Sequence, residues 1–203
     1  MTEKNKYLLL LIPELITKLH RAKYFTKLDV RWSFNNVRIK EGDEWKAVFQ
    51  TNHGLYKPLV IFFGLTNSPA TFQTMMDDIF EDPISEGVVV VYLDNILIFM
   101  ETLEEHRKVT CRILELLEKH KLYLRPDKCE FKKTMIEYLG VIIFYNLVTM
   151  DPVKITGVTE WPALMNKKEV QSFLGFTNFY QRFIKDFLEH AHLLFNLTHN
   201  DAR

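Results

Sequence analysis

The stretch VVVVYLDNILIF, residues 88–99, decides the fold that we predict for this chain, and Gly87 stands just before it. Two apolar runs rich in β-branched residues flank a polar pair, Asp94 and Asn95. This pattern is typical of a buried β-hairpin with its turn at the Asp-Asn pair. Taken alone, Asp94 at the tip of an apolar hairpin is either a turn-forming residue or a ligand.

The segments around the hairpin predict the other elements of one sheet. Residues 24–30 alternate apolar and polar side chains, which indicates a strand that ends at Asp29. Ser68, followed by proline, is typical of a helix start, and that helix is expected to run to about residue 82. A capping box at residues 102–105 begins a second helix, which we expect to end near residue 121. Residues 137–143 predict the last strand.

Other segments give weaker patterns. We predict a short helix at residues 13–20, short strands at 37–39 and 47–49, and one long aromatic helix from a capping box at 166–169 to about residue 187. Gly175 lies within that long helix. It indicates either a close approach of a partner backbone or ordinary helix packing.

The predicted order from residue 24 to residue 143 is strand, helix, strand, strand, helix, strand. This is the ferredoxin-like (split βαβ) order, so we predict an α+β fold. The third strand then lies antiparallel between the first two. A right-handed crossover brings the end of the first strand and the hairpin turn to the same edge of the sheet. Asp29 and Asp94 are therefore expected to meet there, although they are far apart in the sequence.

Two carboxylates at a sheet edge have three chemical interpretations. A general acid–base pair would need one of them desolvated, and the turn position looks open. A structural ion pair would need basic neighbours, and only Lys27 and Arg31 are adjacent in sequence. A magnesium site fits best, because a carboxylate pair without a protein cage holds Mg²⁺ when substrate phosphates complete its ligand shell.

Composition limits the class of protein. The 203 residues are 47% hydrophobic, enough to bury a sizeable core, and 26 basic residues balance 26 acidic ones. A neutral chain is not typical of an autonomous nucleic-acid binder. Two cysteines form neither a disulfide framework nor a zinc spacing, which favours a reducing compartment. No apolar segment has the length of a membrane span, so we expect a soluble, intracellular protein of the cytoplasm or nucleus.

Several motifs in order resemble the polymerase motifs of reverse transcriptases, and the closest resemblance is to gypsy-type long-terminal-repeat retrotransposons. The motifs are FTKLDVRWSF (25–34), FGLTNSPATFQ (63–73), YLDN (92–95), LRPDK (124–128) and EYLG (137–140). Downstream, EWP (160–162) and VQSFLGFTNFY (170–180) look like that group's thumb. The resemblance implies a right-hand polymerase: partial fingers and palm over residues 1–147, and a helical thumb-like region over residues 148–203.

The resemblance also implies a chemistry, namely template-directed DNA synthesis from deoxynucleoside triphosphates on an RNA or DNA template–primer. Asp29 and Asp94 would hold two Mg²⁺ ions with the backbone carbonyl of Val30. One ion would activate the primer 3′-hydroxyl, and the other would neutralise the leaving pyrophosphate.

Further residues receive roles from the same resemblance. Phe34 matches the position that blocks a ribose 2′-hydroxyl, and Lys128 matches a basic residue near the departing phosphate. Gln73 is placed with them at the nucleotide site. The primer and template side comprises Tyr138, Leu139 and Gly140, which match a turn that grips the primer, and Gly175 on a helix along the minor groove.

Two departures from the family pattern bear on activity. The family's turn ends in two aspartates, and here the second is Asn95, a degenerate third acid that should weaken one of the two ions. The chain also begins without the family's basic fingers strands, so we expect an N-terminally truncated copy. Ribonuclease H and integrase regions of a parent polyprotein are expected to be absent. The alternative is a catalytically inert module of the same fold that binds nucleic acid or another protein.

Overall fold

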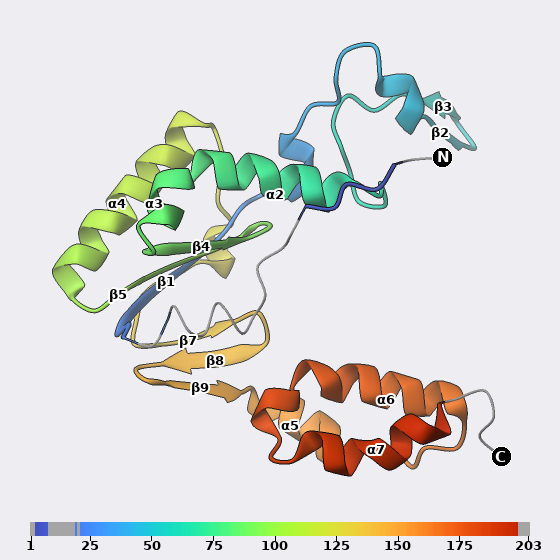
Figure 1. Cartoon of the computed structure of the whole chain (residues 1–203). Coiled ribbons are helices and arrows are strands. Elements are labelled where there is room, and N and C mark those ends of the chain that lie inside the picture. Colours follow the sequence, from blue (N-terminus) through green and yellow to red (C-terminus); the bar gives the residue numbers. More distant parts are fainter. Residues whose placement is uncertain (1–2, 8–18, 20, 199–203) are drawn as a thin grey trace. The chain divides into compact units, whose positions relative to one another are not determined.

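The computed structural model describes residues 3–7, 19 and 21–198 (Figure 1). It forms two compact units. One comprises Met1–Ile136 with Phe144–Leu147, and the other comprises Glu137–Ile143 with Val148–Arg203. This division groups residues 137–143 with the C-terminal part, whereas the sequence prediction placed them in the palm. The helix expected at residues 13–20 lies outside the described residues.

The first unit is built on a four-stranded antiparallel sheet in the order β4-β5-β1-β6. Its elements are β1 (Tyr24–Asp29), η1 (Ser33–Asn36), η2 (Glu44–Ala47), β2 (Phe49–Thr51), β3 (Gly54–Tyr56), α2 (Ser68–Ile79), α3 (Glu81–Ser85), β4 (Val89–Tyr92), β5 (Asn95–Met100), α4 (Leu103–Lys119), η3 (Pro126–Lys128) and β6 (Glu130–Lys133). β5 is antiparallel to both β1 and β4, so it lies between them as predicted.

Helices α2 and α4 cover one face of this sheet (Figure 1). Their apolar stripes pack against alternate strand residues in one buried cluster, which contains Leu28, Phe72, Met76, Ile96, Ile98 and Ile113. Strand residues that point to the opposite face, such as Val90 and Leu97, are buried as well. Burial on both faces explains why the hairpin is an uninterrupted apolar run rather than an alternating one.

The central hairpin turns one residue earlier than predicted. β4 ends at Tyr92, and Asn95 is already the first residue of β5, so Leu93 and Asp94 form the turn. Leu93 adopts a positive φ of 52°, a conformation that costs a non-glycine residue about 1–3 kcal/mol. The prediction at the Asp-Asn pair assumed that the turn would use its most favourable residues, whereas here a leucine is held in the unfavourable conformation.

The predicted last strand was wrong. The fourth strand of the sheet is β6, which pairs with β1. Residues 137–143 instead contribute to two strands of a separate three-stranded sheet, made of β7 (Met135–Tyr138), β8 (Val141–Phe144) and β9 (Leu147–Met150). Leu139 and Gly140 break the apolar run between β7 and β8. Both have positive φ, as a two-residue hairpin turn requires.

The strands predicted around residue 42 also differ from the structure. The small hairpin of the first unit is β2–β3, in which Thr51 pairs with Gly54. Residues 37–39 form no strand, although Arg38 makes an isolated bridge to Val60. The glycine at position 42 marks a turn, but the segment after it is the 3-10 helix η2.

The second unit contains three helices, α5 (Pro152–Thr159), α6 (Lys167–Phe179) and α7 (Phe187–Leu197), with the 3-10 turn η4 (Gln181–Phe183). Val170 and Leu174 of α6 pack against Phe187 and Ala191 of α7. One helix through residue 187 was predicted, but the chain breaks near residue 180 and Asp186 takes a left-handed conformation. Among the described helices of the chain, none is long and apolar enough to cross a bilayer.

Candidate active site

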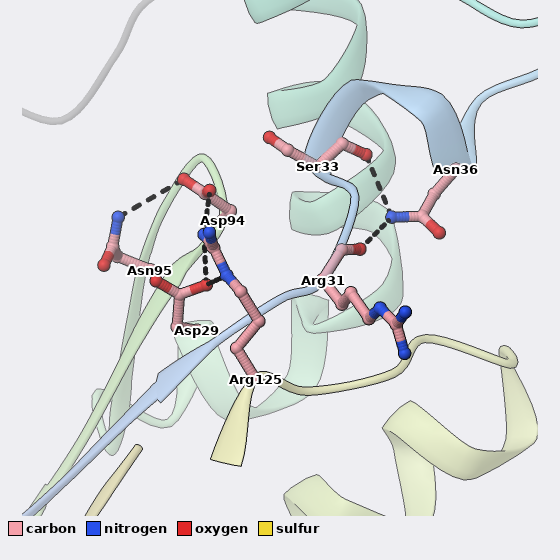
Figure 2. A network of polar contacts seen from close by, with 7 residues as sticks. All are labelled: Asp29, Arg31, Ser33, Asn36, Asp94, Asn95 and Arg125. Atoms are coloured by element: carbon pink, nitrogen blue, oxygen red, sulfur yellow. Dashed lines mark hydrogen bonds and ion pairs between the residues drawn. The ribbon is translucent and has the colours of Figure 1, made fainter. Parts of the chain in front are cut away.

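Asp29 and Asp94 lie side by side at one edge of the four-stranded sheet (Figure 2). Asp29 is the last residue of β1, and its Cα partner on β5 is Asn95, directly after Asp94. The backbone N–H of Val30 donates to the carbonyl oxygen of Asp94 at 2.8 Å, which ties the end of β1 to the turn. The two acids therefore meet at the edge that strand order predicted.

Arg125 contacts both carboxylates (Figure 2). Its guanidinium donates to Oδ1 of Asp29, and its Nη2 lies 3.3 Å from Oδ2 of Asp94. The backbone N–H of Arg125 also donates to the carbonyl oxygen of Asp29 at 2.9 Å. Sequence reasoning missed this residue because it is far along the chain and lies just before η3, in a stretch without periodic pattern.

The two cations that sequence proximity suggested make other contacts. Lys27 forms an ion pair with Glu130 of β6 at 2.7 Å. Arg31 points away from the carboxylates in Figure 2, and its guanidinium stacks 4.5 Å from the ring centre of Trp32. The ion pair that the sequence left as an alternative therefore exists, with Arg125 as the partner.

Burial raises the pKa of Asp94, and the charge of Asp29 raises it further. A backbone hydrogen bond, Arg125 and Lys128 oppose this shift, but burial dominates. Cations close to the pair thus stabilise a charge that burial disfavours. Lys128, expected near the departing phosphate, is exposed at the end of η3.

Gln73 lies beneath the turn and is only 3% exposed. Its Oε1 accepts from the backbone N–H of Leu93 at 2.7 Å, and its Nε2 donates to the carbonyl oxygen of Val91 at 3.1 Å and to Asp77 at 2.9 Å. The amide group is thus occupied by the backbone at the end of β4 and at the first turn residue, and by Asp77. This placement favours a positioning role for Gln73 over the direct nucleotide contact predicted from sequence.

The segment after β1 is a strained loop. Trp32 and Ser33 both have positive φ, 65° and 43°. The Nδ2 atom of Asn36 donates to the carbonyl oxygens of Arg31 and Ser33, at 2.9 Å in each case (Figure 2). Asn36 therefore holds the loop in a conformation that its residues disfavour.

Phe34, at the end of this loop, is held by other aromatic rings. It is 5% exposed, and it contacts Phe63 at 4.7 Å and Phe72 at 5.7 Å between ring centres. The ring of Phe63 is largely exposed, so the pair forms an aromatic surface with one buried and one open side. Such a fixed ring suits a steric role better than a mobile side chain would.

The donor set fits a hard divalent cation. The carboxylates of Asp29 and Asp94 converge closely enough for one guanidinium to contact both, and oxygen atoms are the ligands that Mg²⁺ prefers. Among the described residues, no group of three or more His, Cys, Asp or Glu side chains gathers for metal binding.

The comparison with protein families decides the assignment. The family described as "Reverse transcriptase (RNA-dependent DNA polymerase)" matches residues 2–143. The chain belongs to the reverse transcriptase family. The predicted reverse transcriptase domain is therefore confirmed, and the helices and strands of the structure confirm the predicted α+β fold.

Relatives of this reverse transcriptase domain are retrotransposon polyproteins, which fits the predicted gypsy-type group. The Retrovirus-related Pol polyprotein from transposon opus of Drosophila melanogaster is 39% identical over 183 residues, which is 90% of this chain and 18% of the relative. The Transposon Tf2-7 polyprotein of Schizosaccharomyces pombe is 34% identical over 199 residues, 98% of this chain and 15% of the relative. The chain thus spans less than a fifth of these relatives.

Solved structures share the fold. A foamy viral protease–reverse transcriptase in complex with double-stranded DNA has a TM-score of 0.88 and 22% identity, covering 96% of this chain and 34% of that chain. The same viral protein in complex with an RNA/DNA hybrid has a TM-score of 0.85, also at 22% identity, covering 97% of this chain and 26% of that one. At this identity the likeness concerns the fold alone.

The residues expected at the primer belong to the second unit. Tyr138 is buried, and Leu139 and Gly140 form the β7–β8 turn. Gly140 has a φ of 80°, which favours glycine, and a Cβ atom there would lie 3.1 Å from the hydroxyl of Tyr180, a tight contact. A Cβ atom at Gly175 would meet nothing within 4 Å, so no protein backbone described here explains that glycine.

Proposed function

We propose that this reverse transcriptase domain synthesises DNA on a template from deoxynucleoside triphosphates, at a rate lowered by Asn95. The observation that carries the proposal is the convergence of Asp29 and Asp94 at one sheet edge. When bound there, Mg²⁺ would supply activation of the primer 3′-hydroxyl and neutralisation of the leaving pyrophosphate. Asp29 and Asp94 would hold the metal, with the carbonyl of Val30 as a further ligand.

The remaining residues would position the substrates. The buried ring of Phe34 would exclude a ribose 2′-hydroxyl, because its neighbours Phe63 and Phe72 leave it little freedom to move aside. Lys128 would attract the phosphates. Gln73 would act indirectly, by fixing the turn that carries Asp94.

In the second unit, the turn of Tyr138, Leu139 and Gly140 would contact the primer, and α6 around Gly175 would lie along the template–primer minor groove. The open space at Gly175 supports this assignment, since a nucleic-acid backbone could approach there. The partners would be an RNA or DNA template–primer, as in the viral complexes, and other parts of a parent polyprotein. We place the domain inside the cell, in the cytoplasm or nucleus.

Asn95 is the basis for the lowered rate. Its amide oxygen can coordinate a cation but brings no charge, and its Nδ2 lies 3.3 Å from Oδ1 of Asp94. One of the two ions should therefore bind weakly. This residue also supports the second candidate function, a module of the same fold that binds template–primer or another protein without catalysis.

Extension of an oligo-dT primer on poly-rA tests the proposal. We expect slow extension that depends on Mg²⁺ or Mn²⁺, reduced on the order of a hundredfold or more by Asp94→Asn and increased by Asn95→Asp. A filter-binding assay with an RNA–DNA hybrid accompanies it. Hybrid binding without extension by either the unmodified chain or Asn95→Asp would select the non-catalytic module. Equal extension by these two proteins would show that Asn95 does not limit the rate.

A further inference from the structure

The Arg125 side chain contacts both carboxylates of the site. Its guanidinium reaches Oδ1 of Asp29 and Oδ2 of Asp94 from the same position between them (Figure 2). A divalent cation that bridges the two carboxylates through these oxygens would take the place of the guanidinium. The guanidinium and the metal therefore cannot both bind these two oxygens.

The backbone of Arg125 is anchored independently of its side chain. Its N–H donates to the carbonyl oxygen of Asp29 at 2.9 Å, and its carbonyl oxygen accepts from the N–H of Lys128 at 3.0 Å. The following Pro126 keeps Arg125 extended, with φ −98° and ψ 100°. The side chain is 34% exposed, so it has solvent to move into without unfolding the loop.

Without metal, the charge of Arg125 offsets the repulsion between the two carboxylates of the site. Two neighbouring carboxylates repel each other, and Asp29 is only 7% exposed, so water screens the pair poorly. A guanidinium stays protonated and can contact two carboxylates through separate N–H groups. Arg125 thus supplies from within the chain the positive charge that a metal would otherwise bring.

We propose that Arg125 is an internal cation that occupies the Asp29–Asp94 pair and competes with the divalent metal. This inference rests on the proposed function, because it takes the pair to be the metal site. The metal then binds only the fraction of molecules in which the Arg125 side chain has left the carboxylates. The apparent affinity of the pair for the metal is the intrinsic affinity multiplied by that fraction.

The matched control is Arg112, which carries the same charge and the same kind of contacts away from the site. It pairs with Glu86 at 2.7 Å and Asp82 at 3.7 Å, and its side chain is 40% exposed. Arg112→Gln therefore removes one arginine from between two carboxylates. It leaves the Asp29–Asp94 pair unchanged.

The experiment measures Mn²⁺ binding to the full chain by titration calorimetry, without nucleotide or primer. If the bridged form exceeds the open form about tenfold, Arg125→Gln tightens Mn²⁺ binding about tenfold, whereas Arg112→Gln leaves the dissociation constant unchanged. Thermal unfolding in chelator is measured in parallel. Arg125→Gln should lower the melting temperature more than Arg112→Gln does. Added Mn²⁺ should restore a larger part of that decrease in Arg125→Gln than in Arg112→Gln.

A merely structural role for Arg125 predicts the opposite change in affinity, since losing it would disorder the site and weaken Mn²⁺ binding. Equal or weaker binding by Arg125→Gln would overturn the inference and leave the metal site in place. Absence of Mn²⁺ binding in both the unmodified chain and Arg125→Gln would overturn the proposed function and the inference with it. If Arg125→Gln does not fold, Arg125→Lys replaces it, because an ammonium cannot reproduce the two-sided contact. Tighter Mn²⁺ binding supports the inference there too, and unchanged binding refutes it.

Discussion

Replacement of Gln73 by leucine should destabilise the first unit even when no substrate is present. The side chain is 3% exposed, and its amide accepts from Leu93 N–H and donates to the carbonyl oxygen of Val91. Gln73→Leu keeps a side chain of similar size and high helix propensity, but it removes these two hydrogen bonds and the one to Asp77. It leaves a backbone N–H without its partner at a residue whose φ is positive.

The expected loss follows from these contacts. Each hydrogen bond contributes about 0.5–1.5 kcal/mol net, and a buried donor left unsatisfied costs about 1–3 kcal/mol. The strain at Leu93 would no longer be opposed by the contact with Gln73. Together these effects predict a decrease of roughly 2–4 kcal/mol in the free energy of unfolding. The apolar leucine side chain offsets part of it.

Urea denaturation monitored by circular dichroism measures the decrease in the free energy of unfolding, with Gln50→Leu as the control. Gln50 is an exposed residue of β2 in the same unit, so the same chemical change there should alter stability by less than about 0.5 kcal/mol. A Gln73→Leu protein as stable as the unmodified chain would refute the positioning role. It would return Gln73 to the direct nucleotide contact predicted from its motif.

Three further predictions concern protonation, helix α6 and the charge of the site. Burial, assisted by the charge of Lys132, lowers the pKa of His106 below its ordinary 6.5. Below about pH 6.5 the unfolded chain therefore binds more protons than the folded chain, and the free energy of unfolding should fall as the pH decreases. His106→Gln should reduce this pH dependence, which cannot exceed about 1.4 kcal/mol per pH unit for one group. Gly175→Ala should raise the free energy of unfolding of the second unit by about 0.5–1 kcal/mol, because the added methyl group meets open space. The same change should weaken binding of an RNA–DNA hybrid if α6 lies along the minor groove. In the presence of a chelator, the double variant Asn95→Asp/Arg125→Gln should be destabilised by more than the sum of the two single changes. A double-mutant cycle should give a coupling of about 0.5–3 kcal/mol. Additive effects would contradict a shared charge network.

The meeting of Asp29 and Asp94 could be predicted because it follows from strand order. Two strands that run in parallel with a third between them must bring the end of β1 and the β4–β5 turn to one edge, whatever the side chains are. The hydrophobic pattern was strong enough to establish that order, since the hairpin and the α2 and α4 stripes are long and regular. The central part of the site therefore depended only on features that are visible in sequence.

Features that depend on tertiary contacts could not be predicted. The shift of the turn to Leu93 is stabilised by Gln73, a residue twenty positions earlier, and no local propensity favours leucine at positive φ. The apolar run of residues 137–143 predicts one strand, because a two-residue turn with a single glycine interrupts the pattern only slightly. Arg125 lies outside any periodic segment, so its contact with the carboxylates appears only when the β1–η3 neighbourhood is folded.

Two residues around the carboxylate pair make the site less negative. Where the family's motif has a second aspartate, Asn95 contributes an amide that donates to Asp94. Arg125 adds a positive charge to the same two carboxylates. Three clustered carboxylates without metal would repel one another strongly, whereas two carboxylates bridged by a guanidinium do not. The same two residues would thus stabilise the metal-free fold and weaken the attraction for cations, so stability without metal and the proposed lower catalytic rate would have a common electrostatic cause.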